Sequence, residues 1–181
     1  MMIGHNNGPT MDAGGAWRTH CWGAARKALL PHLPIEVLRG RLKRAGELGL
    51  DYRTYAGIRA TTGRDIVAVL FSSNALELRK GQLEFAAKKI EKLMQTEAWR
   101  QGLATQPLQP CDMLRAAPLD GASAAPAAFA PFRVQRLALQ QALSGFASDE
   151  TILVGAYGAE AEWCATARLA GYVPTQVFFA E

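Results

Sequence analysis

The cationic side chains of the first hundred residues are the clearest chemical feature of this 181-residue sequence. Residues 1–100 hold 16 Lys and Arg against 9 Asp and Glu, whereas residues 101–181 hold 4 against 7. The net charge is therefore +7 in the first part and −3 in the second, within an overall +4. Because a cationic surface attracts polyanions by steering and counterion release, this distribution favours a polyanionic partner. Solvated helix faces rich in Lys and Arg are the alternative explanation.

A spacing pattern lies within this basic part, at residues 41–59 (RLKRAGELGLDYRTYAGIR). Ala45 precedes Gly49 by four residues. The apolar positions that follow the glycine are Leu50, Tyr55 and Ile58. This spacing resembles that of helix-turn-helix DNA-binding domains, in which a small residue lets two helices cross closely and a glycine takes a left-handed turn. The resemblance implies double-stranded DNA as the partner.

The same resemblance implies a recognition helix over residues 52–60 that enters the major groove. The residues it places at base edges are Tyr52, Arg53 and Thr54. The residues it places at phosphates are Arg39, Lys43, Arg44, Arg59 and Arg64. A homodimer is expected if the DNA site is palindromic. Two packed helices joined by a glycine turn would show the same spacing without binding DNA, and this alternative stays open.

A second candidate is the segment 155–160 (GAYGAE), between a predicted strand and a predicted helix. Glycine-rich turns of this kind bind phosphates, because free amides at the start of a helix attract anions. The GxGxxG spacing and the Walker lysine and serine are absent, however. Glu160 and Glu162 would also repel a phosphate. The sequence therefore predicts an ordinary tight connection at this turn.

No residue set predicts a metal site, a cofactor site or a catalytic centre. His20 and Cys21 are adjacent and would point to different faces of a helix, while His5 and His32 lack ligand spacing. Cys164 lies in an apolar segment that predicts a buried thiol. No GxSxG or comparable nucleophile motif occurs. We expect no metal and no cofactor, and a non-enzymatic role is favoured.

The elements that would position these residues follow from apolar periodicity. Spacings of three and four residues predict helices over 16–30, 35–48, 52–60, 74–101, 133–146 and 160–170. Short apolar runs with β-branched residues predict strands over 65–71, 151–156 and 175–179. The last helix and its flanking strands form a βαβ-like unit, and the 65–71 strand could join its sheet.

These elements predict an α+β or α/β protein, with an N-terminal helical bundle that holds the helix-turn-helix-like pair and a small C-terminal βαβ-like unit. The expected organisation has four parts. They are a flexible tail (1–15), a basic, mainly helical domain (16–103), an Ala/Pro-rich linker or irregular excursion (104–132) and a small α/β unit (133–181). The last part could share one sheet with strand 65–71.

Composition restricts the class of protein. Apolar residues make up 49% and charged residues 20%, which is typical of a globular chain. No run approaches the roughly 18 apolar residues of a membrane span, no secretory signal is evident, and the 3 cysteines show no paired spacing, so a cytoplasmic protein is expected. The leading hypothesis is a DNA-binding regulatory protein. The alternatives are a non-catalytic protein-binding adaptor or inhibitor encoded by a phage or mobile element, and a small α/β enzyme.

Overall fold

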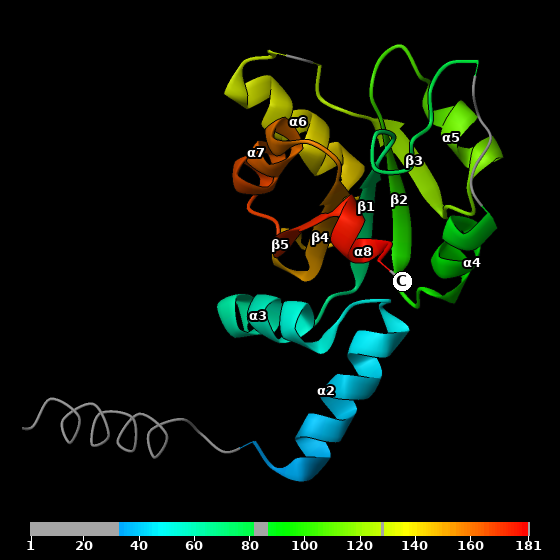
Figure 1. The fold of residues 1–181 in the computed structure, drawn as a ribbon. Helices are drawn as coiled ribbons and strands as arrows, with labels where there is room; N and C mark the ends of the chain where they lie inside the picture. Colours follow the sequence, from blue (N-terminus) through cyan, green and yellow to red (C-terminus); the bar gives the residue numbers. More distant parts are fainter. Residues whose placement is uncertain (1–32, 82–86, 128, 181) are drawn as a thin grey trace, which may run out of the picture. The chain divides into compact units, whose positions relative to one another are not determined.

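The computed structural model describes residues 33–81, 87–127 and 129–180 (Figure 1). The chain divides into two units, residues 1–38 and residues 39–181, and the boundary falls within helix α2 (Ile35–Glu47). The predicted tail at 1–15 and the predicted helix at 16–30 lie outside the described residues. The sheet and both candidate sites belong to the second unit.

A five-stranded parallel sheet forms the centre of the second unit (Figure 1). Its strands are β1 (Ala68–Ser72), β2 (Trp99–Ala104), β3 (Gly121–Ala124), β4 (Thr151–Gly155) and β5 (Gly171–Pro174). They are arranged in the order β3-β2-β1-β4-β5, so the chain builds outward from β1 in one direction and then from β4 in the other. This is the doubly wound arrangement of open α/β folds. The predicted α/β class is confirmed.

The two central strands, β1 and β4, are buried along their whole length. A continuous apolar run suits a parallel strand that is covered on both faces. Val69 and Phe71 belong to the core on one face of the sheet, whereas Leu70 and Leu153 belong to the core on the other. The strand predicted at 65–71 corresponds to β1. It lies in one sheet with β4 and β5, the strands of the expected C-terminal α/β part.

Helices cover both faces. The remaining helices are α3 (Tyr52–Thr62), α4 (Ala87–Gln95), α5 (Pro110–Ala116), α6 (Phe132–Ala142), α7 (Gly158–Ala167) and α8 (Thr175–Phe178), with a 3-10 turn at Ser148–Glu150. Leu139 of α6 and Ala167 of α7 pack in one core. Leu93 of α4, Met113 of α5 and Phe178 of α8 pack in the other. None of the helices in the described ranges combines the length and the apolar character that crossing a bilayer requires.

The helix predicted over 74–101 is wrong. A turn follows β1 at residues 73–77, α4 covers only Ala87–Gln95, and β2 begins at Trp99. Trp99 pairs with Ala68 at the start of the parallel ladder between β2 and β1. The hydrogen bonds and burial gained in the centre of the sheet outweigh the local helical periodicity.

The segment 104–132 is also more ordered than an irregular excursion, because it contains α5 and β3. Pro110 stands at the first position of α5, where its missing N–H costs nothing. The Asp112 carboxylate accepts a hydrogen bond from the backbone N–H of Gln109 at 3.1 Å. β3 then pairs with β2 and forms one edge of the sheet. The Ala/Pro-rich composition predicts a linker or an irregular excursion, whereas Pro110 and Pro131 stand at the starts of α5 and α6.

The predicted strand at 175–179 is wrong as well. The last strand is β5 at Gly171–Pro174, and residues Thr175–Phe178 form the short helix α8. The Phe178 ring packs edge-on against the Phe71 ring, with their centroids 5.3 Å apart. The apolar residues here therefore cover one face of the sheet instead of extending it.

Candidate functional site

Helices α2 and α3 form the pair that the pattern at residues 41–59 predicts. Gly49 lies between them with φ +69°, the left-handed conformation that favours glycine. The Asp51 carboxylate caps α3 by accepting a hydrogen bond from the Thr54 N–H at 3.0 Å. Ala45 and Tyr55 are buried in the core that covers one face of the sheet. Two packed helices joined by a left-handed glycine turn are compatible with a DNA-binding pair and equally with a purely structural hairpin.

The three residues predicted to contact base edges differ in how far their side chains are exposed to solvent. Tyr52 is half-buried and packs against the core, and Arg53 is exposed. Thr54 is half-buried, and its hydroxyl donates a hydrogen bond to the Asp51 carboxylate. That hydroxyl and the Thr54 amide hold the pKa of Asp51 below its ordinary value. Arg53 is the one side chain of the three that is exposed.

Most of the residues predicted at phosphates are engaged within the fold. Arg44 contacts the Asp65 carboxylate at 3.1 Å and donates to the Ile66 carbonyl at 2.9 Å. Arg59 lies 3.4 Å from the same carboxylate of Asp65. These contacts join α2 and α3 to the segment that leads into β1.

Arg64 is engaged by a different pair of acids, Asp149 at 3.0 Å and Glu150 at 2.7 Å. Lys43 lies 3.5 Å from Glu47 but is 82% exposed, and Arg39 is also exposed. Three of the five predicted phosphate contacts, Arg44, Arg59 and Arg64, are thus ion-paired to acids in other segments of the fold, and Lys43 is ion-paired to Glu47 on its own helix. The structure does not bring the five together as one free cationic surface.

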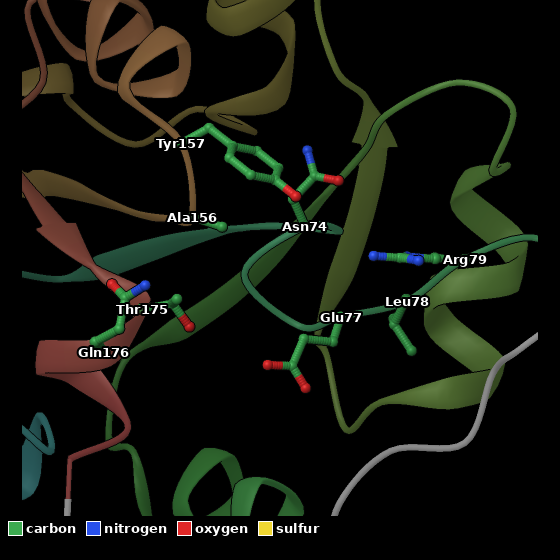
Figure 2. A pocket seen from close by; sticks show the side chains of 8 residues that line it. All are labelled: Asn74, Glu77, Leu78, Arg79, Ala156, Tyr157, Thr175 and Gln176. Carbon is green, nitrogen blue, oxygen red and sulfur yellow. The ribbon is translucent and has the colours of Figure 1, made fainter.

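A cavity lies at the point where the strand order reverses, between the carboxyl ends of β1 and β4 (Figure 2). In doubly wound sheets this is the position at which ligands bind. Its volume is about 330 Å³. It is lined by Asn74, Glu77, Leu78, Arg79, Ala156, Tyr157, Thr175 and Gln176. These residues come from the loop after β1 (residues 73–81), the turn after β4 and the start of α8.

A buried carboxylate closes the turn after β4. Glu160 is only 3% exposed, and its Oε2 accepts hydrogen bonds from the backbone N–H groups of Ala156 at 2.6 Å and Tyr157 at 3.2 Å. Its Oε1 accepts a hydrogen bond from Nδ2 of Asn74 at 2.9 Å, which links this turn to the loop after β1. The carboxylate binds the amides that a phosphate would otherwise contact at this turn.

Gly155 leaves the space that this arrangement needs. A Cβ at this position would lie 2.6 Å from Cε2 of Tyr172 and 2.8 Å from Oε2 of Glu160. The Tyr172 hydroxyl donates a hydrogen bond to the Tyr157 carbonyl at 3.2 Å. Burial, together with the negative charge of Glu160, raises the pKa of Tyr172. The turn is therefore built around Glu160 and Tyr172.

The opposite wall is the 73–81 loop, where Glu77 has φ +58°. The N–H of Leu78 donates to the carbonyl of Ser73 at 2.9 Å, and the N–H of Glu77 donates to that of Asn74 at 3.0 Å. Glycine is the usual left-handed residue in such a turn. Here a carboxylate is present instead, and it lies 2.9 Å from Nζ of Lys89.

Two contacts hold this loop to the C-terminal segment. The Thr175 hydroxyl donates to the carbonyl of Ala75 at 2.9 Å. The Lys89 ammonium, which pairs with Glu77, also lies 5.1 Å from the centroid of the Phe179 ring. The two walls of the cavity are thereby fixed relative to each other.

Arg79 supplies the free charge of the cavity. Its side chain is exposed and makes no ion pair or hydrogen bond within residues 33–81, 87–127 and 129–180. Figure 2 shows its guanidinium group extending from the loop toward Asn74 and Tyr157. The residue pattern at 155–160 predicts the turn after β4. No sequence pattern links this turn to the 73–81 loop or to α8. Only the strand order brings the three segments together.

The described ranges offer few side chains for metal binding or for nucleophilic catalysis. They contain no group of three or more His, Cys, Asp or Glu residues that could hold a metal ion. His5, His20 and His32 lie outside them. Burial raises the pKa of the Cys164 thiol to about 11, so it is a poor nucleophile at neutral pH.

The fold and the cavity define the class: a doubly wound α/β protein with a polar cavity where the strand order reverses. No protein-family model, no curated protein and no solved structure matches the chain. The side chains of the cavity are therefore the evidence for the function of this chain.

Proposed function

We propose that this protein binds a small polar molecule in the cavity between β1 and β4. The observation that carries the proposal is the position of the cavity at the reversal of strand order, where parallel strands end and helix starts converge. Its volume of about 330 Å³ is at the lower end of the range for small-molecule sites. The ligand is accordingly of the size of a simple metabolite.

The lining favours binding over catalysis. It contains no thiol or imidazole, and its one aliphatic hydroxyl, that of Thr175, already donates to the Ala75 carbonyl. The other polar groups of the lining are the carboxamides of Asn74 and Gln176, the phenol of Tyr157, and the charges of Arg79 and of Glu77, which also pairs with Lys89. Such groups orient a ligand through hydrogen bonds and ion pairs.

Calorimetric titration of the full chain with nucleosides, monosaccharides, amino acids and dicarboxylic acids tests this proposal. We expect one of these classes to bind, and Gln176→Trp, which fills the cavity from α8, to weaken binding at least tenfold. Val177→Trp is the matched control, because Val177 is exposed on the same helix and does not line the cavity. No binding by any class, or equal binding by the two variants, would refute the proposal.

DNA binding through α2 and α3 is a second candidate. It is favoured by the left-handed Gly49 turn and by the exposure of Arg53 and Lys43. It is the weaker candidate, since three of the proposed phosphate contacts are ion-paired within the fold. Fluorescence anisotropy with a mixed-sequence duplex tests it.

We expect binding through this surface to weaken steeply with salt, and Arg53→Ala to lower affinity by about 1–3 kcal/mol if Arg53 reads a base. Arg115→Ala is the control, because Arg115 is exposed on α5, away from α3. If no anisotropy change occurs even at low salt, this candidate is excluded.

A further inference from the structure

We infer that the ligand is a small zwitterion of the amino-acid class, whose ammonium group binds Glu77 and whose carboxylate binds Arg79. This inference rests on the proposed function, since it assigns a ligand to the same cavity. The two residues stand two positions apart in the 73–81 loop, carry opposite charges and both line the cavity. Glu77 pairs with Lys89 at 2.9 Å, but its side chain is 71% exposed, so a ligand ammonium can share this carboxylate with Lys89 while the ligand carboxylate binds Arg79.

The turn after β4 argues against a phosphorylated ligand. The two amides at this turn that would hold a phosphate already donate to Oε2 of Glu160. Oε1 of Glu160 accepts from Asn74, so this buried negative charge belongs to the fixed structure. A phosphate placed here would meet a carboxylate in addition to finding no free amide. The anionic group of the ligand must therefore bind elsewhere.

Arg79 is the group available for that anionic part. Its guanidinium has no ion pair in the described ranges and extends over the cavity toward Asn74 and Tyr157 (Figure 2). A guanidinium can hold a carboxylate through two parallel hydrogen bonds, which fixes the orientation as well as the charge of the ligand. The other cation beside the cavity, Lys89, is already paired with Glu77.

Glu77 carries the second half of the assignment. Its left-handed backbone, with φ +58°, is one that glycine would adopt without strain. Strained residues of this kind concentrate at binding sites, where the side chain is needed. The carboxylate already lies 2.9 Å from the Lys89 ammonium, so its surroundings accept an ammonium group. Because the Glu77 side chain is 71% exposed, a ligand can reach it.

Calorimetric titration of the full chain with amino acids tests the assignment. The panel comprises α- and ω-amino acids, the matching amines without the carboxylate, the matching acids without the amine, and ATP. We expect an amino acid to bind, each singly charged analogue to bind at least tenfold more weakly, and ATP not to bind.

Substitutions of Glu77 and Arg79, with Lys80→Gln as the control, test which residues bind the two charged groups of the ligand. Glu77→Gln and Arg79→Gln are each expected to weaken amino-acid binding at least tenfold, whereas Lys80→Gln, in the same loop but outside the cavity lining, leaves it unchanged. Glu77→Gly should raise the Tm while abolishing binding, which separates loss of the ligand from loss of the fold.

Binding of a sugar or a nucleoside without any amino acid would overturn this inference and leave the proposed function standing. If no compound of any class binds, both fail. Unchanged affinity in Glu77→Gln and Arg79→Gln would overturn the assignment of the two residues.

Discussion

Glu160 shows how one carboxylate can determine the chemistry of a turn. It is buried and accepts three hydrogen bonds, from the amides of Ala156 and Tyr157 and from Asn74. Removing one partner of such a network leaves the others buried without partners, which costs more than the hydrogen bonds themselves contribute. Glu160 therefore stabilises the turn after β4 in the folded protein.

Glu160→Ala is expected to lower the free energy of unfolding by about 2–3 kcal/mol, because it removes a charged acceptor from three donors. Glu162→Ala is the matched control on the same helix, and since Glu162 is exposed we expect a change within about 0.5 kcal/mol. Urea denaturation of the two variants and the unmodified protein measures both values. Equal destabilisation by the two variants would contradict this account of Glu160.

Asp65 is the second residue with a measurable consequence. It accepts a hydrogen bond from the Tyr55 hydroxyl at 2.9 Å and ion pairs from Arg44 and Arg59. Burial of the Asp65 carboxyl is the largest single effect on its pKa, and by itself it would raise that pKa. The Tyr55 hydroxyl, the Ile66 amide and the Arg44 guanidinium together outweigh burial, so the pKa lies below the ordinary value of 3.8.

The sign of the pH effect follows from this depression of the pKa. Because the folded state holds the ionised form more strongly than the unfolded chain does, Asp65 contributes stability above the unfolded pKa. This stability is lost as the pH falls from about 5 through the ordinary value and then the lower folded value. We expect the urea midpoint of the protein to fall over this range and that of Asp65→Asn to fall less steeply. Parallel pH profiles would show that the ion pairs of Asp65 contribute nothing.

At the scale of elements, the turn between α2 and α3 depends on one backbone conformation. Gly49 has φ +69°, and a Cβ there would also lie 3.4 Å from the side chain of Lys92. Gly57 lies inside α3, where a Cβ would meet nothing within 4 Å. The same substitution should therefore have opposite effects at these two glycines.

Gly49→Ala is expected to destabilise the protein by about 1–2 kcal/mol, because an L-residue is strained in the left-handed region. Gly57→Ala should stabilise it by about 0.5–1 kcal/mol, since alanine favours a helix interior. The difference in urea midpoints between the two variants measures both effects. Destabilisation by Gly57→Ala would contradict the assignment of residue 57 to an open helix face.

At the scale of the whole molecule, the 104–132 segment is part of the sheet. β3 pairs with β2, and the Arg100 guanidinium holds the Asp120 carboxylate through contacts of 2.9 and 2.8 Å just before β3 begins. The hydrogen bond from Arg100 is the largest effect lowering the pKa of Asp120. The two strands therefore have side-chain as well as backbone connections.

Amide hydrogen exchange measures how firmly β3 is held in the sheet. We expect the amides of β1 and β4 to exchange most slowly, and the paired amides of β3 to exchange more slowly than the amide of the exposed residue Gln106. Asp120→Ala should speed exchange in β3 more than in β4, because it removes the anchor at that edge only. Exchange of β3 within seconds, as in an unstructured linker, would contradict the pairing of this edge strand.

Local signals in the sequence were sufficient for several elements. The apolar runs of β1 and β4 are short, β-branched and buried on both faces, so composition alone identified them. Gly49 and Asp51 marked the turn and the cap of α3 for equally local reasons. The helix expected across 74–101 and the strand at 175–179 failed, since sheet pairing at Trp99 and core packing at Phe178 depend on residues far away in the sequence.

The sequence by itself determined the α/β class, the two central strands and the exclusion of a common phosphate-binding motif, because each depends on residue types close together in the chain. Only the tertiary structure decided which charges are free. Arg44, Arg59 and Arg64 find their carboxylate partners across the fold, whereas Arg79 finds none in the described ranges and faces the cavity. The physical reason is that an ion pair depends on distance in space, which the strand order sets.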